Sequence, residues 1–186
     1  MPFRYQELYN LKMYYDPSLN KMMLPTSSVT GALYLGDLVL KLQRRHHLFV
    51  CGGPSSQKST ILHLLNRNLS KEKGVRCGSI PMSGAVSVTR LKSHIESFFY
   101  PKRKNLLIPK DEGSAIVFMI DDVHLEANIA KTQFLEFFRS WSTIAGYYDT
   151  QLPGFKQVKD FSLLLSANTS YGHDFVPGMN RLKTGV

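Results

Sequence analysis

The stretch CGGPSSQKST, residues 51–60, contains the residue types of a phosphate-binding loop. Counting back from Lys58, Gly52 falls on the first glycine of the pattern G-x-x-x-x-G-K-[ST], and Ser59 supplies the hydroxyl after the lysine. In such loops backbone N–H groups and a helix N-terminus bind phosphate oxygens, the lysine reaches the outer phosphates and the hydroxyl binds Mg²⁺. The predicted nucleotide-binding residues are Gly52, Gly53, Pro54, Ser55, Ser56, Gln57, Lys58, Ser59 and Thr60.

One position of the loop departs from the pattern, because Gln57 stands where the last glycine belongs. If the backbone there is left-handed, a side chain costs about 1–2 kcal/mol, which corresponds to about a tenfold loss of affinity. If its Cβ meets the phosphate, the loss is larger. The alternative is a serine-rich turn that starts a helix, with Ser55 or Ser56 as its cap and Lys58 in solvent. The loop alone leaves both interpretations open.

Polar side chains also end two apolar runs further along the chain. AIVFMIDD (115–122) ends in Asp121, which can lie beside Ser59 so that both bind the Mg²⁺ that bridges the terminal phosphates. Asp122 would then face the attacking water, although many phosphate-hydrolysing folds use the longer glutamate there. The alternative is that both acids cap the following turn. Asn168 ends FSLLLSAN (161–168) and either contacts the water or outermost phosphate, or is an ordinary turn residue.

Alternating strands and helices must position these residues. Strands are predicted at 46–53, 75–82, 115–122 and 161–168, and the third, apolar without alternation, is typical of a strand buried on both faces. Apolar residues at helical spacing predict helices within 30–45, 58–69, 87–100 and 131–145. The last helix is predicted to end at Gly146 and to bury Phe134, Leu135, Phe138, Trp141 and Ile144. PKRKNLLIPKDEGS (101–114) is predicted to be an exposed loop, and the whole order indicates an α/β fold with a parallel sheet covered by helices on both sides.

Composition limits the classes of partner. The 186 residues, 43% hydrophobic, suit one folded unit, and 23 basic against 14 acidic residues give a net charge of +9. The densest basic clusters, QRRHH (43–47) and PKRK (101–104), are short, so nucleic acid is not favoured as a partner. Cys51 and Cys77 lie in predicted strands, which favours buried thiols in a reducing cytosol. No apolar run suggests a membrane partner, and no histidine spacing suggests a metal cluster.

Five segments together resemble an AAA+ module of dynein heavy chains, most closely the third module of axonemal dyneins. They are LPTSSVTGALYLGDLVLKL, LFVCGGPSSQKST, AIVFMIDDVHLEA, FLEFFRSWSTIAGYYD and FKQVKDFSLLLSAN. In that module paired aspartates precede a helix that contains Leu-Arg-x-Trp, and the helix is followed by Gly-Gly-x-Tyr-Asp and a strand hairpin. This chain has FRSW (138–141) in place of the first motif and AGYYD (145–149) in place of the second. The chain departs from the family at three places. It has Ser-Ser-Gln in the loop where the family has further glycines, and His124, Leu125 and Glu126 where the family has Asn-Met-Pro. In the family's Pro-Arg-Phe-x-Arg stretch, Gly178 replaces the first arginine and Arg181 matches the second.

The resemblance implies a three-layer P-loop AAA+ large subdomain over residues 31–186, with residues 1–30 as a leader segment that packs on it. We expect the last strand of the family's sheet and its helical lid to be missing, which would leave LFVCG (48–52) as an apolar sheet edge and the chain poorly soluble alone. The implied cofactors are ATP or ADP with Mg²⁺, both weakened or lost through the departures. Asp122 and Asn168 take catalytic roles in this interpretation, and Ser59 and Asp121 are metal ligands.

The family role that the resemblance implies is to bind or slowly turn over ATP and so regulate the ring of a microtubule motor. Implied partners are neighbouring AAA+ modules of the same heavy chain, dynein intermediate and light chains, and microtubules through other parts of the parent chain. The implied location is cytoplasmic and cytoskeletal, in the axoneme of a cilium or flagellum.

Two other functions stay open: a pseudo-module that binds no nucleotide and only packs against its neighbours, and an independent basic P-loop ATPase acting on nucleic acid. Nucleotide at a hundredfold excess over its Kd would stabilise a binding module by about 2.7 kcal/mol and would not stabilise a pseudo-module. A steep fall in affinity with salt would support the nucleic-acid function.

Overall fold

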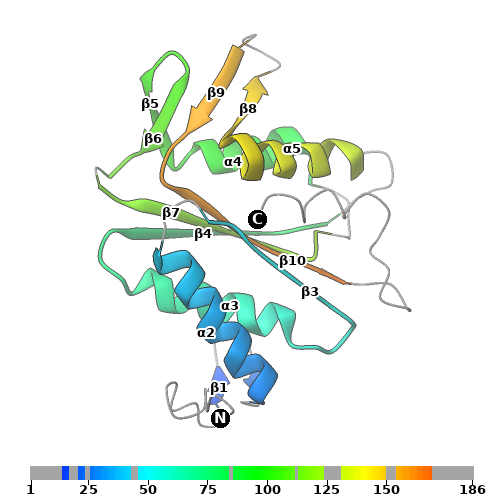
Figure 1. The fold of residues 1–186 in the computed structure, drawn as a ribbon. Coiled ribbons are helices and arrows are strands. Elements are labelled where there is room, and N and C mark those ends of the chain that lie inside the picture. Colours follow the sequence, from blue (N-terminus) through cyan, green and yellow to red (C-terminus); the bar gives the residue numbers. More distant parts are fainter. Residues whose placement is uncertain are drawn as a thin grey trace.

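The computed structural model describes residues 14–16, 21–23, 26–42, 46–83, 86–111, 113–123, 131–149 and 154–168. Within them the chain forms the predicted α/β architecture, a parallel sheet between two layers of helices (Figure 1). A short antiparallel pair, β1 (Tyr14–Asp16) and β2 (Lys21–Met23), precedes the first helix. The boundary between a leader and the subdomain at residue 30 stays a prediction, and the first helix begins at Ser27.

The central sheet has the strand order β3, β10, β7, β4, and all three pairings are parallel. Its strands are β3 (Leu48–Gly52), β4 (Val75–Pro81), β7 (Ala115–Asp121) and β10 (Phe161–Asn168). Residues 115–120 of β7 are all buried, which confirms that this apolar run is an inner strand. Because the strands run the same way, their carboxyl ends lie along one edge of the sheet.

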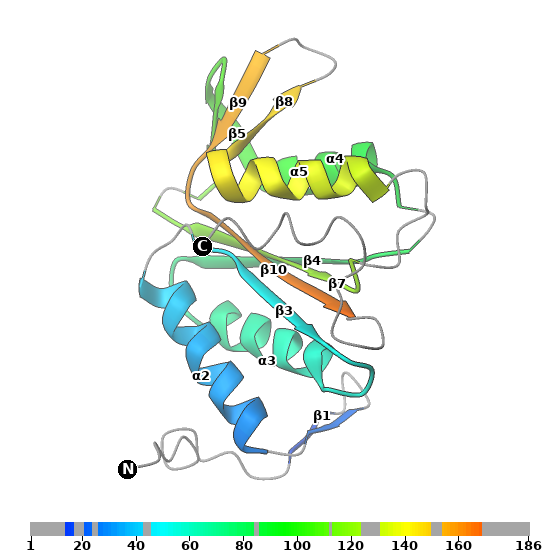
Figure 2. The same cartoon turned by 45° about the vertical axis from the view of Figure 1, so that its right-hand side comes forward.

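Helices α2 (Ser27–Leu42) and α3 (Lys58–Ser70) cover one face of this sheet, and α4 (Val88–Glu96) and α5 (Lys131–Ile144) cover the other (Figures 1 and 2). The helical spacing in α3 does bury one stripe, formed by Ile61, Leu62, Leu65 and Leu69. In α2, Leu33 and Leu40 face the core, whereas Leu35 and Leu38 are exposed. Each helix layer therefore closes its own hydrophobic core against the sheet.

A second four-stranded sheet, of which the family resemblance had indicated one hairpin, lies beyond α4 and α5 (Figure 2). Its order is β5 (Phe99–Arg103), β6 (Leu106–Pro109), β9 (Gly154–Val158), β8 (Gly146–Asp149). The prediction of an exposed loop at 101–114 is therefore wrong, because β5 and β6 form a hairpin there. The antiparallel pair β8–β9 matches the strand hairpin that the family resemblance implied.

Both helices next to this sheet end differently from the prediction. The helix predicted within 87–100 stops at Glu96, because Phe99 already belongs to β5. Phe134, Phe138 and Trp141 of α5 are buried as predicted, but Ile144 in its last turn is 47% exposed. The chain leaves α5 through Ala145, whose φ of 50° is left-handed, and Gly146 starts β8. The helix thus stops just before Gly146, although a different residue makes the turn.

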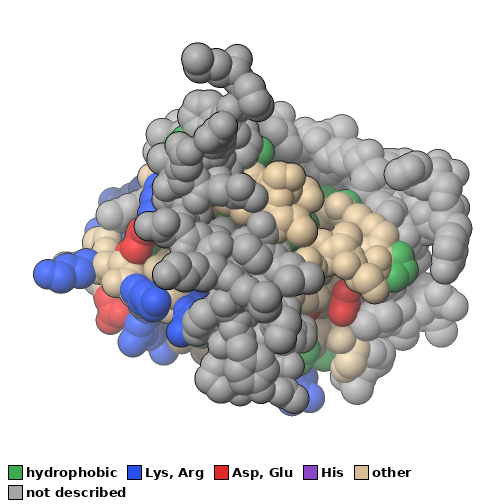
Figure 3. All heavy atoms as spheres, turned by 90° about the horizontal axis from the view of Figure 1, so that it is seen from below, with side chains coloured by type: hydrophobic (Ala, Val, Ile, Leu, Met, Phe, Trp, Pro, Cys, Tyr) green, Lys and Arg blue, Asp and Glu red, His purple; other side chains and the backbone are tan. Residues whose placement is uncertain are grey.

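Three further properties of the described residues concern the hydropathy of the helices, the surface charge and the two cysteines. None of the described helices is long and apolar enough to cross a membrane. Seen from below, Lys and Arg side chains gather toward one side, with a few acidic side chains among them (Figure 3). Cys51 in β3 and Cys77 in β4 form no disulfide, and burial raises the pKa of Cys77 to about 11. Cys77 is therefore protonated and unreactive near neutral pH.

His47, just before β3, should make stability depend on pH. Its Nδ1 accepts a hydrogen bond from the backbone N–H of Leu163 at 3.0 Å, so the folded state needs the neutral ring. Burial, helped by the charge of His46, lowers the pKa of His47 to about 4. The unfolded chain takes up this proton near pH 6.5, so the free energy of unfolding should fall by about 2 kcal/mol as the pH drops from about 6.5 to about 4.

Urea unfolding across this pH range, in wild type and His47→Asn, would measure the effect. The variant should lose most of the pH dependence between about pH 6.5 and 4. His46→Asn is the matched control, because His46 is exposed and should leave most of the dependence in place. Equal pH dependence in all three proteins would show that His47 does not cause it.

Candidate functional site

The loop between β3 and α3 joins a strand to a helix, as the motif requires. Gly52 is the last residue of β3 and Lys58 the first of α3. Gln57 is the N-cap of α3 and has a left-handed backbone, with φ 60° and ψ 21°. The conformation that favours glycine is therefore present at the position where the pattern has glycine, and the strain of about 1 kcal/mol falls on Gln57.

The serine-cap alternative for this loop is wrong. Ser55 is itself left-handed, with φ 62°, and the Oγ of Ser56 donates to the carbonyl of Gly53 at 2.9 Å. The cap residue is Gln57, and its side chain makes no capping hydrogen bond. Its Oε1 is buried and has no hydrogen-bond partner within the described part of the chain. Gln57 is thus unfavourable at this position in both its backbone and its side chain.

Lys58 is only 6% exposed, so the idea of a solvated lysine is also wrong. Its Nζ donates to the carbonyl of Gly53 at 2.6 Å and to Ser56 Oγ at 3.2 Å. The ammonium group is therefore held over the loop itself. Gly52 leaves room for this compact shape, since a Cβ there would lie 2.7 Å from Ser56 Oγ and the serine side chain would have to turn away.

The start of α3 adds further phosphate-binding groups. The first intrahelical hydrogen bond of the helix joins Ile61 N to the carbonyl of Gln57. The N–H groups of Lys58, Ser59 and Thr60 precede it and have no partner within the helix. No acidic residue lies in the first turn of the helix. This end of α3 consequently favours an anion through both its donors and its dipole.

The paired aspartates lie at the end of β7, where Asp121 is the last residue of the strand and Asp122 begins a tight turn that is anchored on β10. Ser166 is fully buried, and its Oγ donates to Asp121 Oδ1. The same Oγ accepts the backbone N–H of Asp122 at 2.9 Å, and the carbonyl of Ser166 accepts the N–H of Val123. Asp122 is left-handed, with φ 55°. One serine on the neighbouring strand thus fixes the carboxylate of Asp121 and the turn that carries Asp122.

Sequence reasoning missed Ser166, because serine in an apolar strand carries no motif. One signal was available: Ser166 lies two residues before Asn168 in the same strand, and residues two apart in a strand point to the same face of the sheet. Asn168 itself ends β10 in register with Gly52 of β3. The phosphate-binding loop, Asp121 with Asp122, and Asn168 therefore follow three adjacent strands at the same edge of the sheet.

The residues that are present fit a nucleotide with Mg²⁺, although not tightly. The loop keeps three features of a phosphate-binding loop: the buried cation of Lys58, the N–H donors of the first turn of α3, and Gly52. Gln57 and Ser55 place side chains in a loop that glycines would leave open. The departures at residues 124–126 and 178, and the matching Arg181, lie outside the described residues.

Comparison with known proteins supplies the family. The family described as the P-loop containing dynein motor region matches residues 11–182. No curated protein sequence matches the chain. Among solved structures, a single-residue mutant of Thermogota maritima RuvB is similar, with a TM-score of 0.47 and 18% sequence identity. That similarity covers 86% of this chain and 44% of the RuvB chain.

Proposed function

From the premise that the chain belongs to the family of P-loop containing dynein motor regions, we propose that this AAA+ module binds ATP or ADP with Mg²⁺ weakly. Its role in this proposal is to regulate a microtubule motor ring through the nucleotide that it holds, with slow turnover or none. Neighbouring AAA+ modules are the partners that membership of this family implies in general.

The observation that carries the proposal is the buried Lys58 at the N-terminus of α3. Burying an ammonium group is costly, and within the described part of the chain a carbonyl and a hydroxyl are its hydrogen-bond partners. A phosphate oxygen would compensate that charge better than these neutral groups. The loop therefore holds a buried cation at the place where a bound phosphate would form its strongest charge interaction.

Each proposed role follows from a residue's place at the sheet edge. Lys58 and the first turn of α3 bind the phosphates, and Ser59 with Asp121 would hold Mg²⁺. Bound Mg²⁺ supplies charge neutralisation between the terminal phosphates. Asp122 is the candidate base that orients water, and Asn168 the group that senses the outermost phosphate. The strain at Gln57 and the short reach of Asp122 make weak binding and slow turnover the expected outcome.

The finer family assignments belong to this proposal as well. They place the chain in the third module of an axonemal dynein heavy chain, with intermediate and light chains as partners and microtubules bound through other parts of the parent chain. The corresponding location is the cytoskeleton, in the axoneme of a cilium or flagellum.

One observation favours a second candidate, a pseudo-module that binds no nucleotide. The Nζ of Lys58 is already hydrogen-bonded to Gly53 and Ser56, so the loop is self-contained as it stands. In that case the module contributes only packing surface to the ring.

Gln57→Gly should tighten ATP binding about tenfold or more, because it removes a side chain at the position where glycine lets the loop backbone approach a phosphate closely. Isothermal titration calorimetry with Mg-ATP measures the change. The matched control is Ala145→Gly, which relieves a left-handed residue of φ 50° after α5, outside the loop. It should raise the free energy of unfolding and leave ATP affinity unchanged. Absence of ATP binding in both wild type and Gln57→Gly would favour the pseudo-module.

A further inference from the structure

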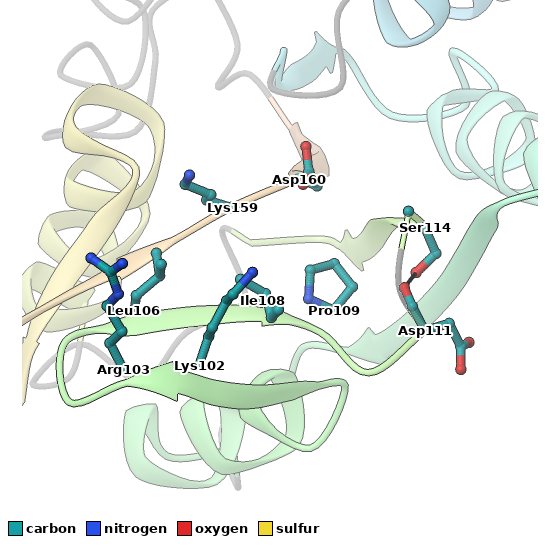
Figure 4. Close-up of a pocket in the computed structure, with 10 residues that line it drawn as sticks. Lys102, Arg103, Leu106, Ile108, Pro109, Asp111, Ser114, Lys159 and Asp160 are labelled. Atoms are coloured by element: carbon teal, nitrogen blue, oxygen red, sulfur yellow. Dashed lines mark hydrogen bonds between the residues drawn. The ribbon is translucent and has the colours of Figure 1, made fainter.

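A cavity of about 520 Å³ lies between the β5–β6 hairpin and the segment that joins β9 to β10 (Figure 4). Leu106, Ile108 and Pro109 of β6 supply its apolar lining. The residues of the phosphate-binding loop do not line it. The cavity is therefore separate from the proposed nucleotide site, and the hairpin that sequence patterns had suggested to be a loop builds one of its walls.

The charges of the cavity are unevenly distributed. Lys102 and Arg103 of β5 and Lys159 before β10 lie toward one end, whereas Asp111 and Asp160 lie toward the other (Figure 4). Asp111 is already paired with Arg76 at 2.7 Å. None of the three cations belongs to an ion pair within the described part of the chain. One end of the cavity thus carries positive charge that no ion pair among the described residues balances.

The exposure of these cations indicates the kind of anion that they can bind. Lys102 and Arg103 are exposed, and Lys159 is only partly buried. An exposed ion pair contributes only about 0–1 kcal/mol, so a single small anion would gain little here. A chain with several carboxylates gains from several such pairs at once, because the second and third contacts form within one complex. Exposed cations of this kind therefore suit a polyanionic chain better than an isolated phosphate.

The apolar lining and the acidic end favour a peptide over nucleic acid. None of the described residues that line the cavity is aromatic, so among them no ring can stack on a base. A peptide can place an aliphatic side chain against Leu106 and Ile108 and an N–H or ammonium group at Asp160. We propose that this cavity binds an acidic, leucine-containing segment of another polypeptide. The proposal does not depend on nucleotide binding.

Fluorescence anisotropy with a defined probe tests the proposal. The probe is fluorescein-labelled Glu-Leu-Glu-Glu-Leu-Glu-Glu-Leu-Glu with an amidated end, titrated with the 186-residue chain. Lys102→Glu and Lys159→Glu should each weaken binding at least about fivefold, and raising NaCl from about 50 to about 300 mM should weaken it further. Replacing the probe's leucines by serines should also reduce its affinity, because the apolar contact is lost.

Arg90→Glu is the matched charge-reversal control. Arg90 is exposed in the first turn of α4, where an acidic residue suits both the helix dipole and the Ser87 cap, so fold and probe affinity should be unchanged. Thermal unfolding of each variant verifies that the fold is kept. The proposal is overturned by no binding of the probe up to about 1 mM of the 186-residue chain, by equal affinity for a lysine version of the probe, or by equal affinity in all variants. Tighter binding of single-stranded DNA that Lys102→Glu abolishes would overturn it in favour of nucleic acid.

Discussion

Lys58→Ala should reduce the ATP affinity of this chain at least about a hundredfold, below what calorimetry detects. The loop has Ser55, Ser56 and Gln57 in place of further glycines, so the charge of Lys58 is the largest favourable interaction left to it. That charge is buried at the start of α3, where it is screened little by water. Titration of wild type and variant with Mg-ATP measures the difference.

Lys71→Ala serves as the control for this experiment, because it removes an exposed lysine at the other end of the same helix. It should leave ATP affinity unchanged. Thermal unfolding without nucleotide must accompany both variants, since Lys58 also bonds the loop carbonyl of Gly53. Equal ATP affinity in wild type and a folded Lys58→Ala would disprove the nucleotide proposal and leave the pseudo-module.

Gly146→Ala should lower the free energy of unfolding by about 3 kcal/mol, the upper end of the usual cost of overpacking. A Cβ on Gly146 would lie 2.3 Å from the backbone oxygen of Lys156 and 2.5 Å from the ring of Phe155. The backbone cannot move away easily, because Gly146 is paired with Gln157 in the β8–β9 hairpin. Urea unfolding measures the loss of stability.

The effect should extend to the aromatic core beneath the hairpin. Tyr147, the next residue, stacks on Trp141 with ring centroids 5.2 Å apart, and Trp141 packs edge-on against Phe161 of β10. The near-ultraviolet circular dichroism of the chain's single tryptophan should therefore weaken in Gly146→Ala. Gly53→Ala is the matched control, because nothing lies within 4 Å of a Cβ there. Comparable destabilisation by both alanines would show that crowding at Gly146 is not the cause.

The sequence was sufficient for features that depend on neighbouring residues. An apolar run without alternation identified β7, and helical spacing identified the buried stripe of α3. Strand, glycine turn and lysine in sequence order located the loop. The pattern also raised a left-handed backbone at Gln57 as one possibility, and the structure has that backbone there. These signals are local, because the helix or strand period and the φ of one residue are reflected in residue types only a few positions apart.

Tertiary structure alone decided the second sheet and the contacts between distant segments. β6 pairs with β9 over only two residue pairs, and both strands are short, so neither has the length that makes alternation recognisable. Ser166 could be connected to Asp121 only after β10 had been placed beside β7. Likewise Lys102 and Lys159 share a cavity only because the hairpin folds toward the end of β9. Such contacts join residues far apart in the sequence, and their partners are selected by packing of the whole chain rather than by local preference.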